Sequence, residues 1–300
     1  MKYLSRKMLT LYLVCRYSIV ETEKLMTKIW VPAGRIPTKD RDFDAVVADV
    51  RHAVFSVIRH RPAANGLFDI TPLGSGFFVS SEVFVTCWHV IDSPASQHQA
   101  GDLYRLVNNL DGLHGIVHEI NGGVGNDIHL YPDSDLAILL SKSKSDQAYM
   151  PVSYADVPVG LEIGIAGYPL AQLSVDSSGN LTLGAVVYRV AKGVATSCFK
   201  TDLDMNDGHP LKDREIIEVN FLFVPGNSGG PIFDARRGRA VAYVKGFRSH
   251  KIQERPEACN LIPVPAGMQK DYLAAVHAVY SIGLTLGPLQ SHLEQFGVKL

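Results

Sequence analysis

Three short segments carry the side-chain types that acyl transfer requires. The first is T-C-W-H-V, which ends around His89; the second is D-S-D-L-A-I-L, which contains Asp135; the third is P-G-N-S-G-G-P, which contains Ser228. A serine hydroxyl becomes a nucleophile when a neighbouring base removes its proton, and an imidazole with an ordinary pKa of about 6.5 suits that task. A carboxylate orients the imidazole and stabilises its protonated form. The sequence therefore offers a nucleophile, a base and an orienting acid.

Each of these residues also has an ordinary structural interpretation. Ser228 alone could mark a glycine-rich turn, His89 a core histidine and Asp135 the end of a strand. Asp133, two residues before Asp135, is its rival for the role of the acid. The three contexts together favour a catalytic set, since the glycines around Ser228 would also turn backbone N–H groups toward a developing oxyanion.

Short β-type runs must position these side chains. They are rich in Val, Ile, Phe and Tyr and are separated by Gly, Asn, Asp or Pro. About ten such runs without intervening long helices predict antiparallel barrels and not a parallel α/β sheet. Helices are expected only near the ends of the chain, over residues 43–50, 268–279 and 289–296. The predicted strands are residues 53–58, 77–80, 83–86, 103–107, 116–120, 135–140, 161–166, 181–190, 216–224 and 240–247.

With these motifs the chain resembles the trypsin-like (chymotrypsin-fold) serine proteases, and most of all the bacterial high-temperature-requirement type. The resemblance rests on the G-S-G run before T-x-x-H-V, on D-L-A-I-L and on P-G-N-S-G-G-P, and it extends over about residues 50–300. It implies an all-β fold of two packed antiparallel six-stranded β-barrels with short terminal helices. His89 and Asp135 would come from the first barrel and Ser228 from the second.

The resemblance also sets the expected domain limits. The polar stretch Ser141–Gln147 would link the two barrels, and no appended PDZ domain is expected after the second. The first 40 residues would be a leader or an extension, with Met26 as an alternative start. The expected parts are an N-terminal extension 1–40 and a peptidase domain 41–300, made of a first barrel 50–142, a second barrel 155–250 and a C-terminal strand with helices 265–300.

The roles implied by the resemblance are those of a serine endopeptidase that forms an acyl-enzyme. His89 would act as general base and then general acid, Asp135 would orient it, and Ser228 would be the nucleophile. The backbone N–H groups of Gly226 and Ser228 would form the oxyanion hole. Asn227 stands where digestive relatives carry an aspartate that captures a freed amino terminus, so activation by that route is not expected.

Two residues are candidates for the substrate pocket. Leu222 lies six positions before Ser228, where relatives line the floor of the pocket, and it predicts an apolar or small residue before the cut bond. Lys245 in the neighbouring strand would instead favour an acidic residue. The segment 248–265 reads as an insertion beside the cleft, without an assigned role.

Composition narrows the partners. Lys+Arg number 29 and Asp+Glu 30, for a net charge of -1, which gives no electrostatic basis for a nucleic-acid partner. No apolar run reaches the length of a membrane span. The four cysteines form no C-x-x-C pair, and His114 and His118 lack the glutamate of a zinc-binding helix, so neither metal nor cofactor is expected. We expect a cytoplasmic rather than a secreted protein, with a protein or peptide substrate and an activating partner or oligomer.

Two other functions fit parts of the sequence. G-N-S-G-G also matches the G-x-S-x-G motif of α/β-hydrolases, whose acid and histidine would then come from Asp234, Asp271, His277 and His292. That esterase hypothesis leaves His89 and Asp135 unexplained. The alternative from another class is a catalytically latent or silent protease fold that binds peptides or partner proteins.

Overall fold

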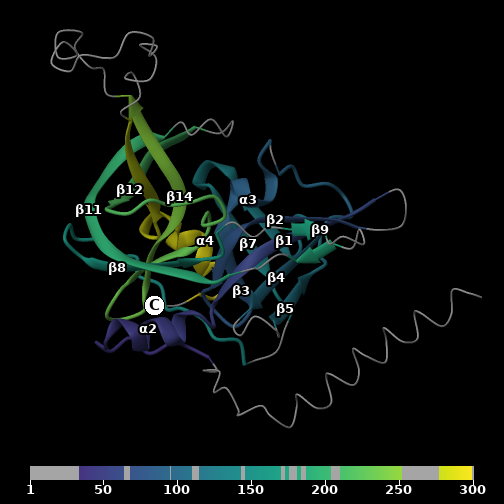
Figure 1. The fold of residues 1–300 in the computed structure, drawn as a ribbon, viewed down its shortest axis with the longest axis horizontal. Coiled ribbons are helices and arrows are strands. Elements are labelled where there is room, and N and C mark those ends of the chain that lie inside the picture. The colour runs from purple at the N-terminus through teal and green to yellow at the C-terminus, as the bar shows by residue number, and fades with distance from the viewer. Residues whose placement is uncertain are drawn as a thin grey trace, which may run out of the picture. The chain divides into compact units, whose positions relative to one another are not determined.

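The computed structural model is built from two antiparallel β-sheets with short helices (Figure 1). The residues that it describes contain no helix long and apolar enough to cross a membrane. The structure describes residues 34–63, 68–94, 96–109, 115–142, 146–169, 173–175, 181–183, 187–203, 210–251 and 277–298. The alternative start at Met26 and most of the segment 248–265 lie outside these ranges.

The first sheet contains seven strands, in the spatial order β5-β4-β1-β2-β3-β7-β6, and every neighbouring pair is antiparallel. Its central strands β3 and β7 are almost wholly buried, as their continuous apolar runs V-F-V-T-C and L-A-I-L-L predict. The strands are β1 (Val54–Pro62), β2 (Phe68–Phe78), β3 (Val83–Cys87), β4 (Leu103–Asn109), β5 (Gly115–Ile120), β6 (Ile128–Tyr131) and β7 (Leu136–Leu140).

The second sheet closes into a barrel, in the order β11-β12-β15-β14-β13-β8. A separate pair of short strands, β9 (Leu173–Val175) and β10 (Leu181–Leu183), lies between β8 and β11 in the sequence. Figure 1 draws the barrel in teal, green and yellow. Its strands are β8 (Glu162–Gly167), β11 (Arg189–Leu203), β12 (Leu211–Val219), β13 (Pro231–Asp234), β14 (Ala240–Lys251) and β15 (His277–Thr285).

The predicted all-β fold is confirmed, with two differences in detail. The first sheet has seven strands and two ends, β5 and β6, instead of six strands in a closed ring. The additional strand is β6, whose four residues I-H-L-Y form too short a run to predict a strand. The predicted helix 268–279 is wrong at its described end, because His277–Val279 belong to β15 and pair with β14.

Short helices support the sheets. The predicted helix over residues 43–50 is present as α2 (Phe43–Val50), and its Val46 and Val50 are fully buried. One of the two apolar core clusters of the described residues joins both sheets and includes Phe78 and Tyr243, and the other lies within the barrel. The remaining helices are α3 (Trp88–Asp92), η1 (Pro132–Ser134), η4 (Gly287–Leu289) and α4 (Gln290–Glu294).

Candidate active site

His89 and Asp135 meet because two neighbouring strands end at the same place. His89 lies in α3, directly after β3, and Asp135 lies directly before β7. Strands β3 and β7 are antiparallel, with Cys87 opposite Leu136, so the end of one strand lies beside the start of the other. The Trp88 N–H donates a hydrogen bond of 2.9 Å to the Asp135 carbonyl and holds the two segments together.

The contact between the two side chains fixes the imidazole. His89 Nδ1 lies 2.9 Å from Asp135 Oδ2 and 3.0 Å from Oδ1, and the His89 backbone N–H donates to Oδ1 at 3.0 Å. A carboxylate accepts hydrogen bonds, so the proton of the neutral imidazole sits on Nδ1 and leaves the Nε2 lone pair available. Asp133, the alternative candidate for the acid, is exposed on η1 and makes no hydrogen bond to His89 among the described residues.

The carboxylate of Asp135 is buried yet ionised. Asp135 is 1% exposed and has a left-handed backbone with φ 47°. Burial by itself raises the pKa of Asp135, but the His89 imidazole and the Lys245 ammonium outweigh that effect and lower it to about 2. Asp135 therefore keeps its negative charge at neutral pH.

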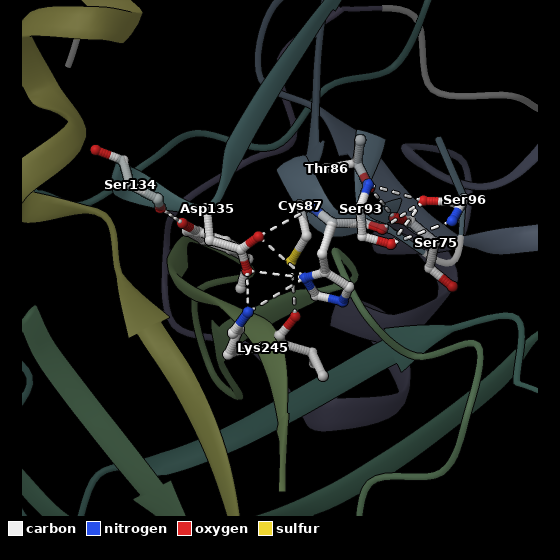
Figure 2. A network of polar contacts seen from close by, with 11 residues as sticks. Ser75, Thr86, Cys87, Ser93, Ser96, Ser134, Asp135 and Lys245 are labelled. Atoms are coloured by element: carbon white, nitrogen blue, oxygen red, sulfur yellow. Dashed lines mark hydrogen bonds and ion pairs between the residues drawn. The ribbon is translucent and has the colours of Figure 1, made fainter. Parts of the chain in front are cut away.

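Lys245 is the third member of this cluster. Its Nζ lies 3.0 Å from Asp135 Oδ2 and 3.4 Å from His89 Nδ1, and its side chain is 2% exposed. Figure 2 shows the ammonium and the carboxylate pointing toward one another. The expectation that Lys245 reads an acidic substrate residue is therefore corrected, because its charge is directed at Asp135. The cause is a β-bulge in β14, where the register against β15 shifts between Val244 and Gly246 and leaves Lys245 as the extra residue.

Cys87 completes the surroundings of the carboxylate (Figure 2). Its Sγ contacts the Val244 carbonyl at 3.2 Å, and burial raises the pKa of Cys87 well above its usual value. Ligand atoms of Cys87, His89 and Asp135 lie within 4.8 Å of one another, which is a composition that can hold a metal. A protonated thiol is a poor ligand, and the Lys245 ammonium already occupies the same carboxylate. The arrangement favours proton transfer over cation binding.

Ser228 lies on the turn between β12 and β13, and this turn depends on glycine. Gly226 has φ 96° and Gly229 has φ 83°, and residues other than glycine rarely adopt this backbone conformation. A Cβ on Gly229 would lie 2.3 Å from both the Ser75 carbonyl oxygen and Thr86 Oγ1. The turn can therefore approach the first sheet only without a side chain at this position.

Backbone N–H groups of this turn divide into two kinds. Those of Asn227, Gly229 and Gly230 donate to the carbonyls of Val224 (3.1 Å), Val244 (2.8 Å) and Asn227 (2.9 Å). Those of Gly226 and Ser228 have no acceptor among the described residues. The two N–H groups predicted for the oxyanion hole are thus the two that the turn leaves unbonded.

Ser75 holds the turn from the first sheet, a role that the sequence analysis did not predict and for which the G-S-G run was the available signal. Its N–H donates to the Ser228 carbonyl at 2.9 Å, and its Oγ donates to the Gly226 carbonyl at 2.6 Å. The same Oγ accepts the Tyr168 N–H at 2.8 Å. These bonds fix the peptide groups on both sides of Ser228.

A family model named the trypsin-like peptidase domain matches residues 74–242, which is more than half of the chain and includes His89, Asp135 and Ser228. The chain belongs to the trypsin-like peptidase family.

Other relatives of this trypsin-like peptidase are distant. The uncharacterized protein y4bJ of Sinorhizobium fredii is 29% identical over 177 residues, a match that covers 58% of this chain and 22% of that protein's length. The active form of the Rv3671c protease from M. tuberculosis superposes with a TM-score of 0.52 at 15% identity, covering 92% of this chain and 94% of that chain. The HtrA-type protease AlgW with a decapeptide gives a TM-score of 0.49 at 16% identity, with 85% and 67% covered. The Rv3671c superposition supports the fold.

Leu222, the other residue predicted for the substrate pocket, is not among the residues in contact in this cluster. Leu222 is 61% exposed in the turn that follows β12, and Phe247, two residues beyond Lys245, is 50% exposed. The adjacent Phe223 N–H donates to Ser281 Oγ at 2.7 Å and anchors that turn to β15. Leu222 is therefore exposed to solvent at this turn.

The esterase hypothesis is wrong, because the chain belongs to the trypsin-like peptidase family. Asp234 Oδ1 accepts the backbone N–H groups of Arg236 and Arg237 in a turn, and His292 packs against the Tyr131 ring. Neither contacts Ser228 among the described residues, and Asp271 lies outside them. The sheets are antiparallel and lack the crossover helices of an α/β-hydrolase in the described residues.

Proposed function

We propose that this trypsin-like peptidase is a serine endopeptidase that cleaves peptide bonds through an acyl-enzyme on Ser228. The observation that carries the proposal is the double contact of His89 Nδ1 with the buried, ionised Asp135 carboxylate, at 2.9 and 3.0 Å. It fixes the tautomer in which Nε2 can accept a proton, which is the state that a general base requires.

The first half of the reaction forms the acyl-enzyme. His89 Nε2 takes the proton of Ser228 Oγ as the oxygen attacks the peptide carbonyl carbon. The N–H groups of Gly226 and Ser228 donate to the oxyanion of the tetrahedral intermediate. When the carbon–nitrogen bond breaks, the imidazolium gives its proton to the leaving amine, and the acyl group stays on Ser228.

The second half releases the product. His89 removes a proton from a water molecule that attacks the acyl carbon, and the tetrahedral intermediate uses the same oxyanion hole. Its collapse breaks the bond to Ser228 Oγ, which recovers its proton from His89. Asp135 remains ionised throughout and balances the charge of the imidazolium.

The substrate side of the proposal is a preference for an apolar or small residue before the cut bond, because Leu222 offers an exposed apolar side chain and the Lys245 ammonium is directed at Asp135. A peptide library separates the possibilities. Cleavage after apolar or small residues supports the proposal, whereas cleavage mainly after Lys, Arg, Asp or Glu contradicts it.

Labelling with a fluorophosphonate tests the nucleophile. Intact mass should show one adduct on the native chain and none on Ser228→Ala. Ser153→Ala is a matched control, because Ser153 is a partly buried serine of the same chain outside the cluster, and it should label like the native protein. A folded native chain that takes up no adduct would contradict the proposal and favour a silent protease fold that binds peptides or partner proteins.

A further inference from the structure

We propose that Lys245 is a positioning residue that holds the acid of the catalytic set and restrains proton uptake by His89. The inference deepens the proposed function and rests on it for its catalytic meaning. Lys245 reaches the site from β14 of the second sheet, whereas His89 and Asp135 both belong to the first. It therefore adds a charge to the acid–base pair from the opposite side of the molecule's core.

The hydrogen-bond geometry defines what Lys245 does to Asp135. Oδ1 receives the His89 backbone N–H, and Oδ2 receives both the His89 Nδ1–H at 2.9 Å and the Lys245 ammonium at 3.0 Å. Both Nδ1–H and the ammonium are donors, so their separation of 3.4 Å brings the Lys245 charge close to the imidazole without a hydrogen bond between them. Lys245 thus pins the carboxylate and faces the imidazole at the same time.

The charges around the imidazole decide the sign of the effect. Asp135 and Lys245 cancel one another, and they are buried to 1% and 2% exposure of their side chains. Cys87 from β3 and Tyr243 from β14 stay neutral, because burial raises the pKa of each well above its usual value. Asp133 on η1 is exposed to solvent, which screens its charge.

A proton on His89 therefore adds a positive charge that the cluster does not already balance. An opposite charge favours the charged form of a neighbour, and a like charge at this distance disfavours it. The Asp135 carboxylate therefore favours the protonated imidazole, and the Lys245 ammonium disfavours it. Removal of the Lys245 charge should therefore make protonation of His89 easier, because the Asp135 charge would then act on the imidazole without an opposing charge.

Substitution of Lys245 separates the charge from the packing. Lys245→Met keeps much of the length and removes the charge, whereas Lys245→Arg keeps the charge. We expect the protonation midpoint of His89 to rise by roughly one to two pH units in Lys245→Met, and to stay within about half a unit in Lys245→Arg because a like charge remains. A side chain that merely fills space would leave the midpoint where it is.

The direct measurement is an NMR titration of the His89 ring in the full chain carrying Ser228→Ala, which removes the nucleophile and any self-cleavage. The series compares Lys245, Lys245→Met and Lys245→Arg in that background. A higher midpoint in the Met variant alone supports the inference. Equal midpoints in all three variants, or a lower one in the Met variant, overturn it.

A stability cycle covers the case in which Lys245→Met perturbs folding. Asp135→Asn alone leaves a buried ammonium without its carboxylate, so it should lower the melting temperature more than the double variant Asp135→Asn with Lys245→Met does. Additive changes, with the double variant the least stable of all, would show that the two charges are not coupled and would overturn the inference.

The two proposals fail in different ways. If fluorophosphonate labelling fails but the midpoint of His89 moves as expected, the proposed hydrolysis is wrong and the action of Lys245 on the imidazole stands. If labelling succeeds and the midpoint does not move, the peptidase proposal stands and the inference about Lys245 falls.

Discussion

The two halves of the candidate site are held by different kinds of interaction. The acid–base half consists of His89, Asp135 and Lys245, and ionised side chains in a buried cluster hold it together. The nucleophile half is the turn around Ser228, and neutral backbone hydrogen bonds hold it, with Ser75 as the supporting side chain. The first half owes its geometry to charge, and the second owes its geometry to the absence of Cβ atoms.

This difference predicts different sensitivities. A change of one charge should disturb the acid–base half while the backbone around it stays in place. A change of one methyl group should disturb the nucleophile half at any pH, because no titrating group takes part in its hydrogen bonds. Three changes test this division, and a fourth measures the pH dependence of stability that arises outside the site.

The largest effect is expected for Asp135→Asn. An amide cannot balance the imidazolium and favours the wrong tautomer, so kcat/KM should fall by roughly 10⁴-fold. Initial rates of peptide cleavage measure it. Asp133→Asn, an exposed neighbour on η1, should retain native rates. A comparable loss in the control would show that the acid had been assigned to the wrong residue.

Gly229→Ala should come next, and its effect should appear in folding as well as in activity. A methyl group at φ 83° would lie 2.3 Å from the Ser75 carbonyl oxygen, which predicts a loss of about 3 kcal/mol in the free energy of unfolding. Urea denaturation measures this loss. Gly123→Ala is the matched control, because a Cβ there would meet nothing within 4 Å. Equal stability of the two variants would contradict the tight approach.

Ser75→Ala should have a smaller effect. The change leaves the Gly226 carbonyl and the Tyr168 N–H without their partner, at a cost of roughly 1–3 kcal/mol, and it should slow fluorophosphonate labelling. Ser56→Ala is a close control, since Ser56 lies opposite Ser75 in the sheet and its buried Oγ has no hydrogen-bond partner within the part of the chain that the structure describes. If Ser56→Ala slowed labelling as much, the role of Ser75 as a support would be refuted.

The smallest effect is expected from His52, a titrating residue outside the candidate site. Burial, with help from Arg51, lowers the pKa of His52 from 6.5 to about 4. His52 binds a proton more readily in the unfolded chain, so its contribution is fully present above pH 6.5 and is lost as the pH falls toward 4. His52→Gln should flatten the fall of stability over that interval. The melting temperature measured as a function of pH gives the contribution of His52 to this loss of stability. That contribution must be subtracted before any loss of stability at low pH is attributed to the catalytic cluster.

The sequence was sufficient for the parts of the molecule that local patterns encode. Buried strands such as β3 show as continuous apolar runs, and each member of the His89, Asp135 and Ser228 set lies in a short distinctive context. The resemblance favoured Asp135 over Asp133, and the structure adds the physical reason, because Asp135 is buried with a left-handed backbone directly after η1.

Long-range contacts explain what the sequence could not show. The direction of Lys245 depends on a one-residue bulge against β15, a strand that was itself partly predicted as helix. Ser75 meets Gly226 across 151 residues of sequence. Neither relation leaves a periodicity in the residues around it, since both arise only when the two sheets are already packed together.

The separation of Lys245 from Asp135 along the chain also governs when the site can exist during synthesis. The first sheet is complete at Leu140, whereas the cation that neutralises its buried carboxylate is translated about a hundred residues later. Domains of a growing chain fold as units in order of their emergence. The first sheet must therefore emerge from the ribosome with Asp135 and His89 still hydrated at its surface. The candidate site becomes complete only when β14 has been translated and the barrel closes over it, so we expect a nascent chain that ends before β14 to lack activity.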